Sequence, residues 1–324
     1  MKELRRREFL VLGGTLLAAQ TAARQASASP PRPPATLPRA WLAASTIPLW
    51  PDDPPGFASF APQPVPDNMS PVFVHNVSRP DIRVFRPARP NGRALLVVPG
   101  GAYSFVSIAN EGLDVAARMT PLGVTVFVLT YRLPGNGWSN RSDVPLQDAQ
   151  RAMRVIRANA SRFAIDATGV SVLGFSAGGH LAATLATQHA EQTYAPRDSI
   201  DEFGARPFAA GLIYPVITME VPGTHDLSRK LLLGESPSVA DIERRSAERH
   251  VDSNTPPGFI VHAFDDTAVP VENSLRYLNA LREAKRPVEA HLLQEGGHAF
   301  GVGLAGTPSE SWPSLFLTWL GRNR

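Results

Sequence analysis

The 324-residue sequence contains no cysteine, which excludes disulfides, thiolate catalysis and cysteine-based zinc or iron–sulfur sites. It also lacks the basic stripe with interleaved aromatic residues that nucleic-acid-binding proteins use. The net charge is +3 and the pI is about 9.5, but the basic residues are spread thinly. The sequence therefore predicts no nucleic-acid partner. Because 43% of the residues are hydrophobic and only 19% are charged, a chain of this length can bury a full-sized core.

The N-terminus has a short apolar stretch, from Phe9 to Ala19, which is too short to span a bilayer. Arginines precede it and the small residues "ASA" at 26–28 follow it, which is the pattern of an export signal. The Arg-Arg-Glu-Phe-Leu segment at 6–10 resembles a twin-arginine signal, although Arg5 stands where Ser or Thr is usual. We therefore expect residues 1–28 to be a signal peptide and the mature protein to be periplasmic or secreted, with no stable membrane anchor. The alternative is a basic amphipathic start of a cytoplasmic protein.

Residues 29–68 are rich in proline and aromatic residues, which predicts an extended linker followed by an arm laid over the domain. The catalytic domain is expected to occupy residues 69–324. Its first two segments, 71–77 and 81–88, alternate apolar and polar residues and are predicted to form an antiparallel pair. The stretch 218–257 is long for a connection and is predicted to be a small cap or substrate-binding insertion.

Six short runs that are apolar throughout predict strands covered on both faces of a sheet. These runs are 93–100, 124–132, 169–176, 209–217, 258–266 and 288–296. Helical stretches separate most of them, the clearest being 143–163, which begins with Asp143 as a cap. Others are 180–190, 271–285 and 311–320. This alternation predicts an α/β protein with a mostly parallel central sheet and helices on both faces.

The sequence "GFSAG" at 174–178 fits the G-x-S-x-G pattern of a nucleophile elbow. It lies between a predicted strand and a predicted helix, where a strained turn presents the serine hydroxyl at the positive end of the helix dipole. A glycine-rich turn with no chemistry is the alternative. The pattern makes Ser176 the candidate nucleophile.

A nucleophilic serine needs a base and an acid, which on such a sheet follow it in the order Ser, acid, His. Asp266 ends one predicted strand and His298 follows the last one, so both lie at the sheet edge where Ser176 is expected. Asp265 is interpreted as a turn or capping residue, and His262, in mid-strand, as a satisfied core histidine. The spacing of these residues does not match a helical metal-ligand pair, so no metal is predicted.

The tetrahedral intermediate of ester hydrolysis needs backbone N–H donors. The N–H of Ala177, directly after the nucleophile, is one candidate, and the loop "PGGAY" at 99–103 supplies the others. A bare glycine turn explains the glycines but not their position after the required strand.

Several segments together resemble the acetyl esterase and acetylxylan-esterase-like branch of the bacterial α/β-hydrolase superfamily, near the hormone-sensitive-lipase group. They are "PGGAY", "YRLP", "PLQDAQRAMRVIRANA", "GFSAGGHLAAT", "YPVI", "TPPGFIVHAFDDTAVPVENS" and "EGGHAFG". The resemblance implies an α/β-hydrolase fold, Ser176, His298 and Asp266 as the catalytic triad, and Gly101, Ala102 and Ala177 as oxyanion donors. Where the lipase-like relatives have His-Gly-Gly-Gly, this chain has Pro99 to Ala102, so the histidine that supports that loop is absent. Glu111 also matches the family pattern, without a role that the sequence explains.

The sequence thus predicts an exported serine esterase that needs no metal or organic cofactor and hydrolyses short-chain, chiefly acetyl, esters on plant-derived carbohydrate such as acetylated xylan. A general short-chain carboxylesterase, a peptidase and a non-catalytic carbohydrate-binding protein on this fold are the alternatives. Its partner is a small-molecule or oligosaccharide ester, and the sequence leaves the oligomeric state open. Five aromatic residues of the arm and loops are candidates either for stacking on sugar rings or for packing the arm: Trp41, Trp50, Phe57, Tyr103 and Trp138.

Overall fold

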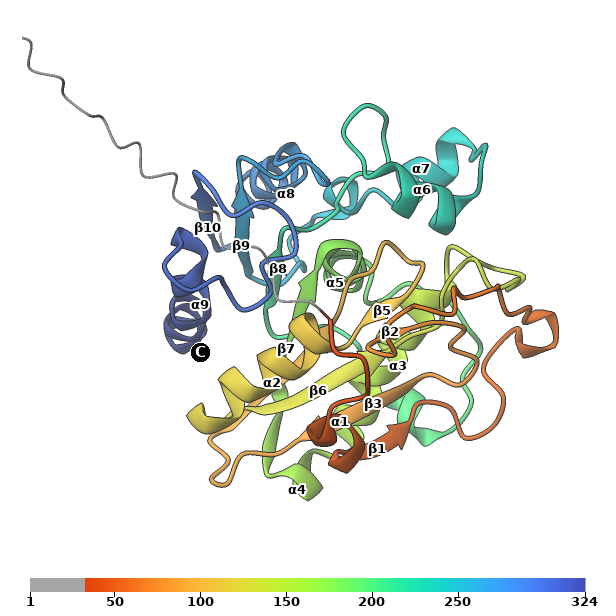
Figure 1. Ribbon diagram of the computed structural model, residues 1–324, viewed down its shortest axis with the longest axis horizontal. Coiled ribbons are helices and arrows are strands. Elements are labelled where there is room, and N and C mark those ends of the chain that lie inside the picture. Colours follow the sequence, from red (N-terminus) through yellow and green to blue (C-terminus); the bar gives the residue numbers. More distant parts are fainter. Residues whose placement is uncertain (1–32, 324) are drawn as a thin grey trace, which may run out of the picture.

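The computed structural model of the chain describes residues 33–323, so the predicted signal peptide lies outside the described residues. An eight-stranded sheet forms the centre, in the order β1-β3-β6-β4-β7-β8-β9-β10 (Figure 1). In that order the strands are β1 (Ser45–Pro48), β3 (Asp81–Phe85), β6 (Thr125–Thr130), β4 (Gly92–Val98), β7 (Ile165–Phe175), β8 (Ala210–Ile213), β9 (Gly258–Ala263) and β10 (Val288–Leu293). The pairs from β6 to β10 are all parallel, whereas β3 runs antiparallel to both β1 and β6. The prediction of a mostly parallel sheet is confirmed.

The predicted antiparallel pairing of 71–77 with 81–88 is wrong. β2 (Phe73–Val74) instead pairs with β5 (Val106–Ser107), and β3 enters the main sheet. The reason lies between them: Asn76 adopts a left-handed conformation (φ 51°), and its side chain bonds the backbone of Gln63. The chain therefore leaves the strand direction before a hairpin can form.

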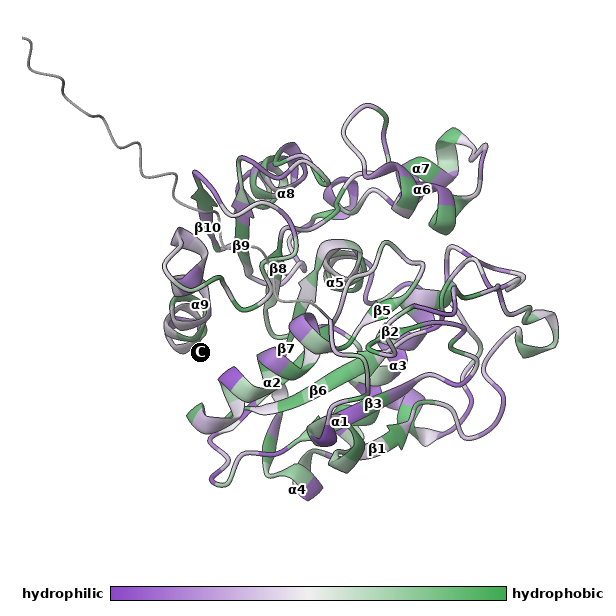
Figure 2. Cartoon of the chain, viewed as in Figure 1, coloured by the Kyte–Doolittle hydropathy of each residue, from purple (hydrophilic) through white to green (hydrophobic). Residues whose placement is uncertain are grey.

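Helices cover both faces of the sheet. They are α1 (Arg39–Ala43), α2 (Asp114–Met119), α3 (Val144–Ala158), α4 (Ala160–Phe163), α5 (Ser176–Thr187), α6 (Asp226–Leu233), α7 (Val239–Arg244), α8 (Glu272–Glu283) and α9 (Trp312–Arg322). Successive residues of a strand point to opposite faces, and β9 shows the consequence. Phe259 packs its ring on Phe316 of α9, while His262 bonds Ser274 of α8. Strand β6 is buried along its whole length and is mostly hydrophobic (Figure 2).

The arm is joined to the sheet through β1 and through buried charges. Arg132 and Asp148 form an ion pair in which neither side chain is exposed, at 2.8 Å. Trp50 of the arm donates its indole N–H to Asp148 at 2.9 Å, and Arg132 donates to the carbonyl of Pro55 at 2.6 Å. A buried ion pair is tolerated only when its remaining donors and acceptors are also hydrogen-bonded. Here Trp50 and Pro55 of the arm form two of those hydrogen bonds.

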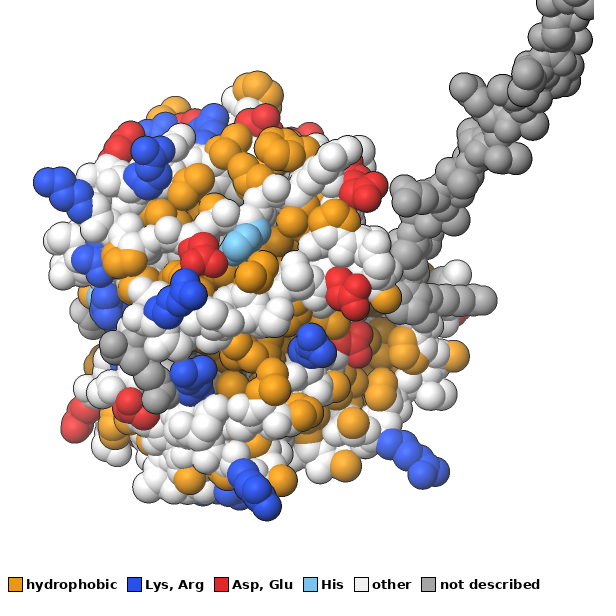
Figure 3. Space-filling view, turned by 90° about the vertical axis from the view of Figure 1, so that its left-hand side faces the viewer, with side chains coloured by type: hydrophobic (Ala, Val, Ile, Leu, Met, Phe, Trp, Pro, Cys, Tyr) orange, Lys and Arg blue, Asp and Glu red, His pale blue; other side chains and the backbone are white. Residues whose placement is uncertain are grey.

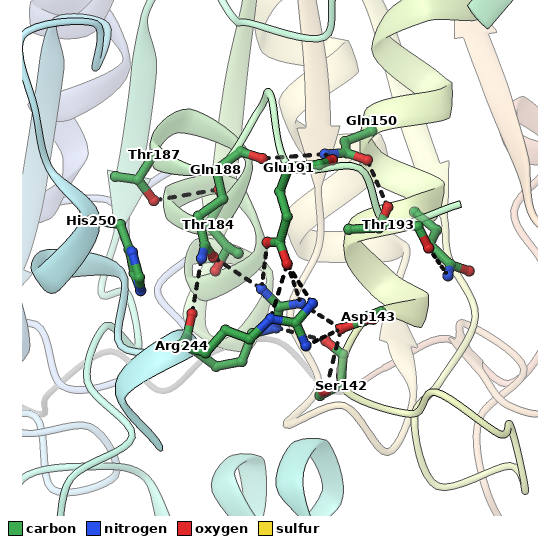
Figure 4. Close-up of polar contacts among 12 residues, drawn as sticks. Ser142, Asp143, Gln150, Thr184, Thr187, Gln188, Glu191, Thr193, Arg244 and His250 are labelled. Atoms are coloured by element: carbon green, nitrogen blue, oxygen red, sulfur yellow. Dashed lines mark hydrogen bonds and ion pairs between the residues drawn. The ribbon is translucent and has the colours of Figure 1, made fainter. Parts of the chain in front are cut away.

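The stretch 218–257 contains α6 and α7, which lie on the side of the molecule opposite α1 and β1 (Figure 1). Two adjacent arginines at the end of this insertion bind the body of the domain. Arg245 lies 2.5 Å from Asp143 and 2.9 Å from Glu191, and Arg244 contacts the same two carboxylates (Figure 4). Asp143 precedes α3, as predicted, but its side chain pairs with these arginines instead of capping the helix.

On the face drawn in Figure 3, side chains of both charges are scattered among apolar ones, without a patch of one sign. Among the helices within residues 33–323, none combines the length and the apolar character needed to cross a bilayer.

Candidate active site

Ser176 stands at the junction of β7 and α5, in a strained turn. Its φ of 51° lies in the left-handed region, as predicted for an elbow, and its side chain lines a cavity of about 830 Å³. The two flanking glycines are required by contact rather than by flexibility. A Cβ on Gly174 would overlap the carbonyl of Gly178, and a Cβ on Gly178 would overlap the carbonyls of Val98 and Pro99. The serine is thus held at the N-terminus of α5 by close packing of strand, helix and the neighbouring loop.

The three residues predicted to act together are brought into one chain of hydrogen bonds. Nε2 of His298 lies 2.9 Å from Oγ of Ser176, and Nδ1 of His298 lies 2.7 Å from Oδ2 of Asp266. Asp266 follows β9 and His298 follows β10, so the carboxyl ends of β7, β9 and β10 meet at this edge. The His298 side chain is 22% exposed while the Asp266 carboxylate is buried, which leaves the histidine accessible from the cavity.

A second histidine, which the sequence reasoning treated only as a core residue, also bonds Asp266. Nε2 of His262 lies 3.1 Å from Oδ2 of Asp266 and 3.0 Å from the carbonyl of Val269. Both partners are acceptors, so this nitrogen carries the proton, and Nδ1 accepts from Ser274 at 2.7 Å. His262 is therefore satisfied, as predicted, and it also orients the carboxylate. Its position four residues before Asp266 was the signal available in the sequence.

Burial alone would raise the pKa of Asp266, but hydrogen bonds from His262 and His298 and from the N–H of Val269 outweigh burial. Together they hold the pKa of Asp266 well below its usual range. The neighbouring Asp265 accepts the N–H of Gly297 at 2.8 Å and so fixes the loop that carries His298. The structure brings Asp266, and not Asp265, to His298.

The loop after β4 holds the other predicted donors, Gly101 and Ala102, and both line the cavity. Their backbones are left-handed, with φ of 126° and 53°, and for alanine this conformation is uncommon. The N–H of Gly100 is already bonded to the carboxylate of Glu111 at 2.7 Å. In the described part of the chain, the N–H groups of Gly101, Ala102 and Ala177 have no protein acceptor, which leaves them available to a ligand oxygen.

The cavity in front of Ser176 has a volume of about 830 Å³. Its walls come from three parts of the chain. The arm contributes Pro34 and Ala40, the 218–257 insertion contributes His225, and the domain contributes apolar residues such as Phe73 and Phe105. Most ligand sites share this character, apolar with a few convergent polar groups. The sequence predicted a cap or substrate-binding insertion over 218–257, but nothing in it indicated that His225 would be the residue to line the cavity.

The aromatic residues considered for sugar stacking do not line this cavity. Four of the five are buried, with 5% exposure or less: Trp41, Trp50, Tyr103 and Trp138. Trp50 is bonded to Asp148, and Tyr103 bonds Nδ1 of His180 at 2.7 Å. Phe57 is partly exposed and stacks on Phe60. These aromatic residues therefore pack the arm and loops, which was the alternative for each of them.

Comparison with known proteins gives consistent likenesses. A family model described as BD-FAE matches residues 81–281, more than half of the chain. The chain is 37% identical over 208 residues to the endo-1,4-beta-xylanase B of Butyrivibrio fibrisolvens, covering 64% of this chain and 32% of that protein. It is 33% identical over 225 residues to the acetylxylan esterase of Xylanibacter ruminicola, covering 68% of this chain and 43% of that protein. The chain thus spans less than half the length of these curated relatives.

Among solved structures, the chain resembles an acetyl ester-xyloside bifunctional hydrolase from Caldicellulosiruptor lactoaceticus, with a TM-score of 0.73 and 31% identity. That alignment covers 86% of this chain and 96% of the other. A carboxylesterase from Lactobacillus plantarum, at 24% identity and a TM-score of 0.63 over 75% of this chain and 93% of that one, shares the fold.

Proposed function

The chain belongs to the BD-FAE family of α/β-hydrolases, and from this premise we propose that it is an exported serine esterase. Its substrates are short-chain, chiefly acetyl, esters on plant-derived carbohydrate such as acetylated xylan. Family membership and the solved relatives confirm the α/β-hydrolase fold and the esterase resemblance that the sequence motifs predicted. The observation that carries the proposed chemistry is the continuous hydrogen bonding from Ser176 through His298 to Asp266.

The proposed reaction is acyl transfer in two steps. Oγ of Ser176 attacks the ester carbonyl while Nε2 of His298 takes its proton, and Asp266 keeps the imidazole in the tautomer with hydrogen on Nδ1. The oxyanion is bound by backbone N–H groups, for which Gly101, Ala102 and Ala177 are the candidates. His298 then protonates the departing alcohol, and a water molecule releases the acid by the same route. These residues need no metal or organic cofactor for either step.

Two observations support a carbohydrate ester as the substrate. Several relatives carry names that refer to xylan or xylosides, among them the acetylxylan esterase and the acetyl ester-xyloside hydrolase. The cavity of about 830 Å³ is also far larger than an acetyl group. An acetyl ester that fills it must therefore bring a bulky alcohol, as a sugar does. Export is proposed from the twin-arginine pattern at the N-terminus.

The test compares the mature protein, starting at about residue 29, with Ser176→Ala. Hydrolysis of p-nitrophenyl acetate, butyrate and octanoate is measured, with acetic acid release from acetylated xylan in parallel. We expect activity on acetate and on xylan that disappears in the variant. Activity on the small esters without acetic acid release from xylan would indicate a general short-chain carboxylesterase with no preference for carbohydrate esters. A folded protein without activity on any ester would contradict the proposed function, and a peptide substrate would then be assayed.

A further inference from the structure

Glu111 is a buried carboxylate that the triad does not use. Only 3% of the residue is exposed, and it lies in the π-helical turn Ala109–Leu113 that leads into α2. Its two oxygens bond different parts of the chain. Oε2 accepts the N–H of Gly100 at 2.7 Å, and Oε1 accepts the hydroxyl of Tyr214 at 2.9 Å. Removing a carboxylate from water costs free energy unless hydrogen bonds or charges compensate it. The two bonds of Glu111 provide that compensation.

The contact with Gly100 lies directly behind the nucleophile. A Cβ on Gly100 would lie 2.9 Å from Cβ of Ser176 and 3.1 Å from Oε2 of Glu111. The carboxylate therefore holds the first residue of the loop whose next two residues, Gly101 and Ala102, line the cavity with left-handed backbones. A strained loop keeps its geometry only when its surroundings determine it.

The contact with Tyr214 extends to the loop of the catalytic base. The Tyr214 hydroxyl accepts the N–H of Gly301 at 3.0 Å, three residues after His298. The Tyr214 ring also packs against the imidazole of His298, with ring centroids 4.9 Å apart. Tyr214 itself has a φ of 38°, so its backbone is strained at the end of β8. One side chain thus touches both the imidazole and the loop that follows it.

The donors in this cluster point to an ionised carboxylate. The N–H of Gly100 and the O–H of Tyr214 both donate to Glu111, and a carboxylate offers one acceptor oxygen to each. Burial raises the pKa of Glu111, and the bonds from Gly100 and Tyr214 and the charge of His298 reduce that rise without cancelling it, so ionisation is inferred from the two donors. The sequence places Pro99 where lipase-like relatives have a histidine, so the loop needs a different support.

We propose that Glu111 is a positioning residue that ties the oxyanion loop, residues 100–102, to the loop of His298 through Tyr214. The inference rests on the proposed function and deepens it. During acyl transfer, negative charge develops at the oxyanion donors and positive charge on the imidazole. A single carboxylate that holds both loops fixes the distance between these two charges before the substrate arrives, and such preorganisation acts on the chemical step rather than on binding.

The test uses Glu111→Gln, Tyr214→Phe and the double variant, with p-nitrophenyl acetate as substrate. A carboxamide has one acceptor oxygen, so Glu111→Gln leaves either the Gly100 N–H or the Tyr214 O–H without an acceptor. We expect kcat to fall about 10- to 100-fold with KM within about threefold, since a single oxyanion donor is worth about 10²–10³ in kcat. Tyr214→Phe keeps the Gly100 bond, so a smaller loss is expected. The double variant should be no worse than Glu111→Gln, because both changes break the same connection.

Glu283→Gln, on the exposed end of α8, serves as the control for removing a carboxylate. A purely structural residue would lower stability and spare kcat. For a positioning residue we expect the reverse, so the melting temperature of Glu111→Gln should stay within about 3 °C of wild type. A folded Glu111→Gln with kcat within threefold of wild type, or losses that multiply in the double variant, would overturn the inference. Absence of hydrolysis in the wild type would instead remove the proposed function, so the two failures are distinguishable.

Discussion

The edge of the sheet and the walls of the cavity are built in different ways. At the edge, Ser176, Asp266 and His298 follow three strands of one sheet; hydrogen bonds link the three to one another and join Asp266 to the buried His262. The walls come partly from the domain and partly from two further segments, the arm and the 218–257 insertion, which contribute residues such as Ala40 and His225. The triad residues depend on one another through hydrogen bonds, whereas, within residues 33–323, Ala40 and His225 make no hydrogen bond to the triad and can be substituted singly.

This difference separates two properties of an esterase. Residues at the edge should determine whether any ester is cleaved, because the chemical step depends on their mutual geometry. Residues in the walls should determine which ester is cleaved, because they meet only the parts of a substrate that lie away from the carbonyl. Changes at the edge should therefore lower kcat for all esters alike, and changes in the walls should alter the ranking of esters.

The largest effect is expected at the edge, from Asp266→Asn. An asparagine in this place favours the wrong imidazole tautomer, so we expect kcat to fall about 10⁴-fold for every ester in the series. KM should change little, and the relative rates on acetate and butyrate should be preserved. Steady-state kinetics on both esters provides the measurement.

Asp265→Asn is the matched control, because Asp265 bonds the N–H of Gly297 and does not contact the imidazole of His298. Its effect on kcat should stay below about 10-fold. Equal losses in the two variants would mean that the geometry of the loop, and not the tautomer of the imidazole that Asp266 fixes, controls the rate.

The edge was also the part that the sequence predicted best. Each of Ser176, Asp266 and His298 follows an apolar run, and parallel strands bring such positions to the same side of a sheet. The connections behind the edge could not be predicted, because Glu111 and Tyr214 lie 103 residues apart and meet only through the order of the strands. The contact of His262 with Asp266 joins residues only four positions apart, so the sequence offered a signal for it that the assignment of His262 as a core residue did not use.

An intermediate effect, on the pH dependence of stability, is expected at His180 of α5, which lies between the edge and the insertion. Nδ1 bonds the hydroxyl of Tyr103, beside the oxyanion loop, and Nε2 bonds the carbonyl of Arg245, in the insertion, both at 2.7 Å. Burial lowers the pKa of His180 to about 4. In the unfolded chain this histidine binds a proton near pH 6.5, but the folded protein resists protonation down to about pH 4.

The folded state should therefore lose stability as the pH falls from 6.5 to 4, by up to about 3 kcal/mol from this residue. Above pH 6.5 its contribution is constant. Urea unfolding at pH 7 and pH 4.5 measures the loss, and His180→Gln separates it from other groups. The difference between the two pH values should shrink by about 2–3 kcal/mol in the variant. The same pH dependence in both proteins would contradict this account of His180.

The smallest effect is expected in the walls, from Ala40→Phe. The larger side chain would occupy cavity volume beside the arm without reaching the triad. We expect kcat/KM to fall about 10-fold for the bulkiest ester that the enzyme accepts and less than threefold for p-nitrophenyl acetate, as for a pocket narrowed by a few methylene groups. Leu42→Phe is the control, because Leu42 is 62% exposed and lies outside the cavity. An equal loss of kcat/KM on all esters in Ala40→Phe would contradict the view that the cavity walls determine which ester is cleaved.

The walls were also the part that the sequence predicted least well. The arm was expected to lie over the domain, and the structure shows in addition that its β1 joins the sheet and its Trp50 bonds the buried Asp148. Hydrophobic periodicity predicts which face of an element is buried, but not which distant segment packs against that face. For this reason the five candidate aromatic residues were assigned two possible roles, and only the structure distinguished them.

The most direct test of the account is the site at which a fluorophosphonate reacts with the folded, mature protein. Peptide mapping by mass spectrometry after a short incubation identifies the modified residue, and ester hydrolysis is followed in the same sample. We predict a single adduct on Ser176 that forms at the rate at which hydrolysis is lost. Loss of hydrolysis with Ser176 unmodified, or no adduct on a folded protein, would contradict the central claim that this elbow serine is the nucleophile.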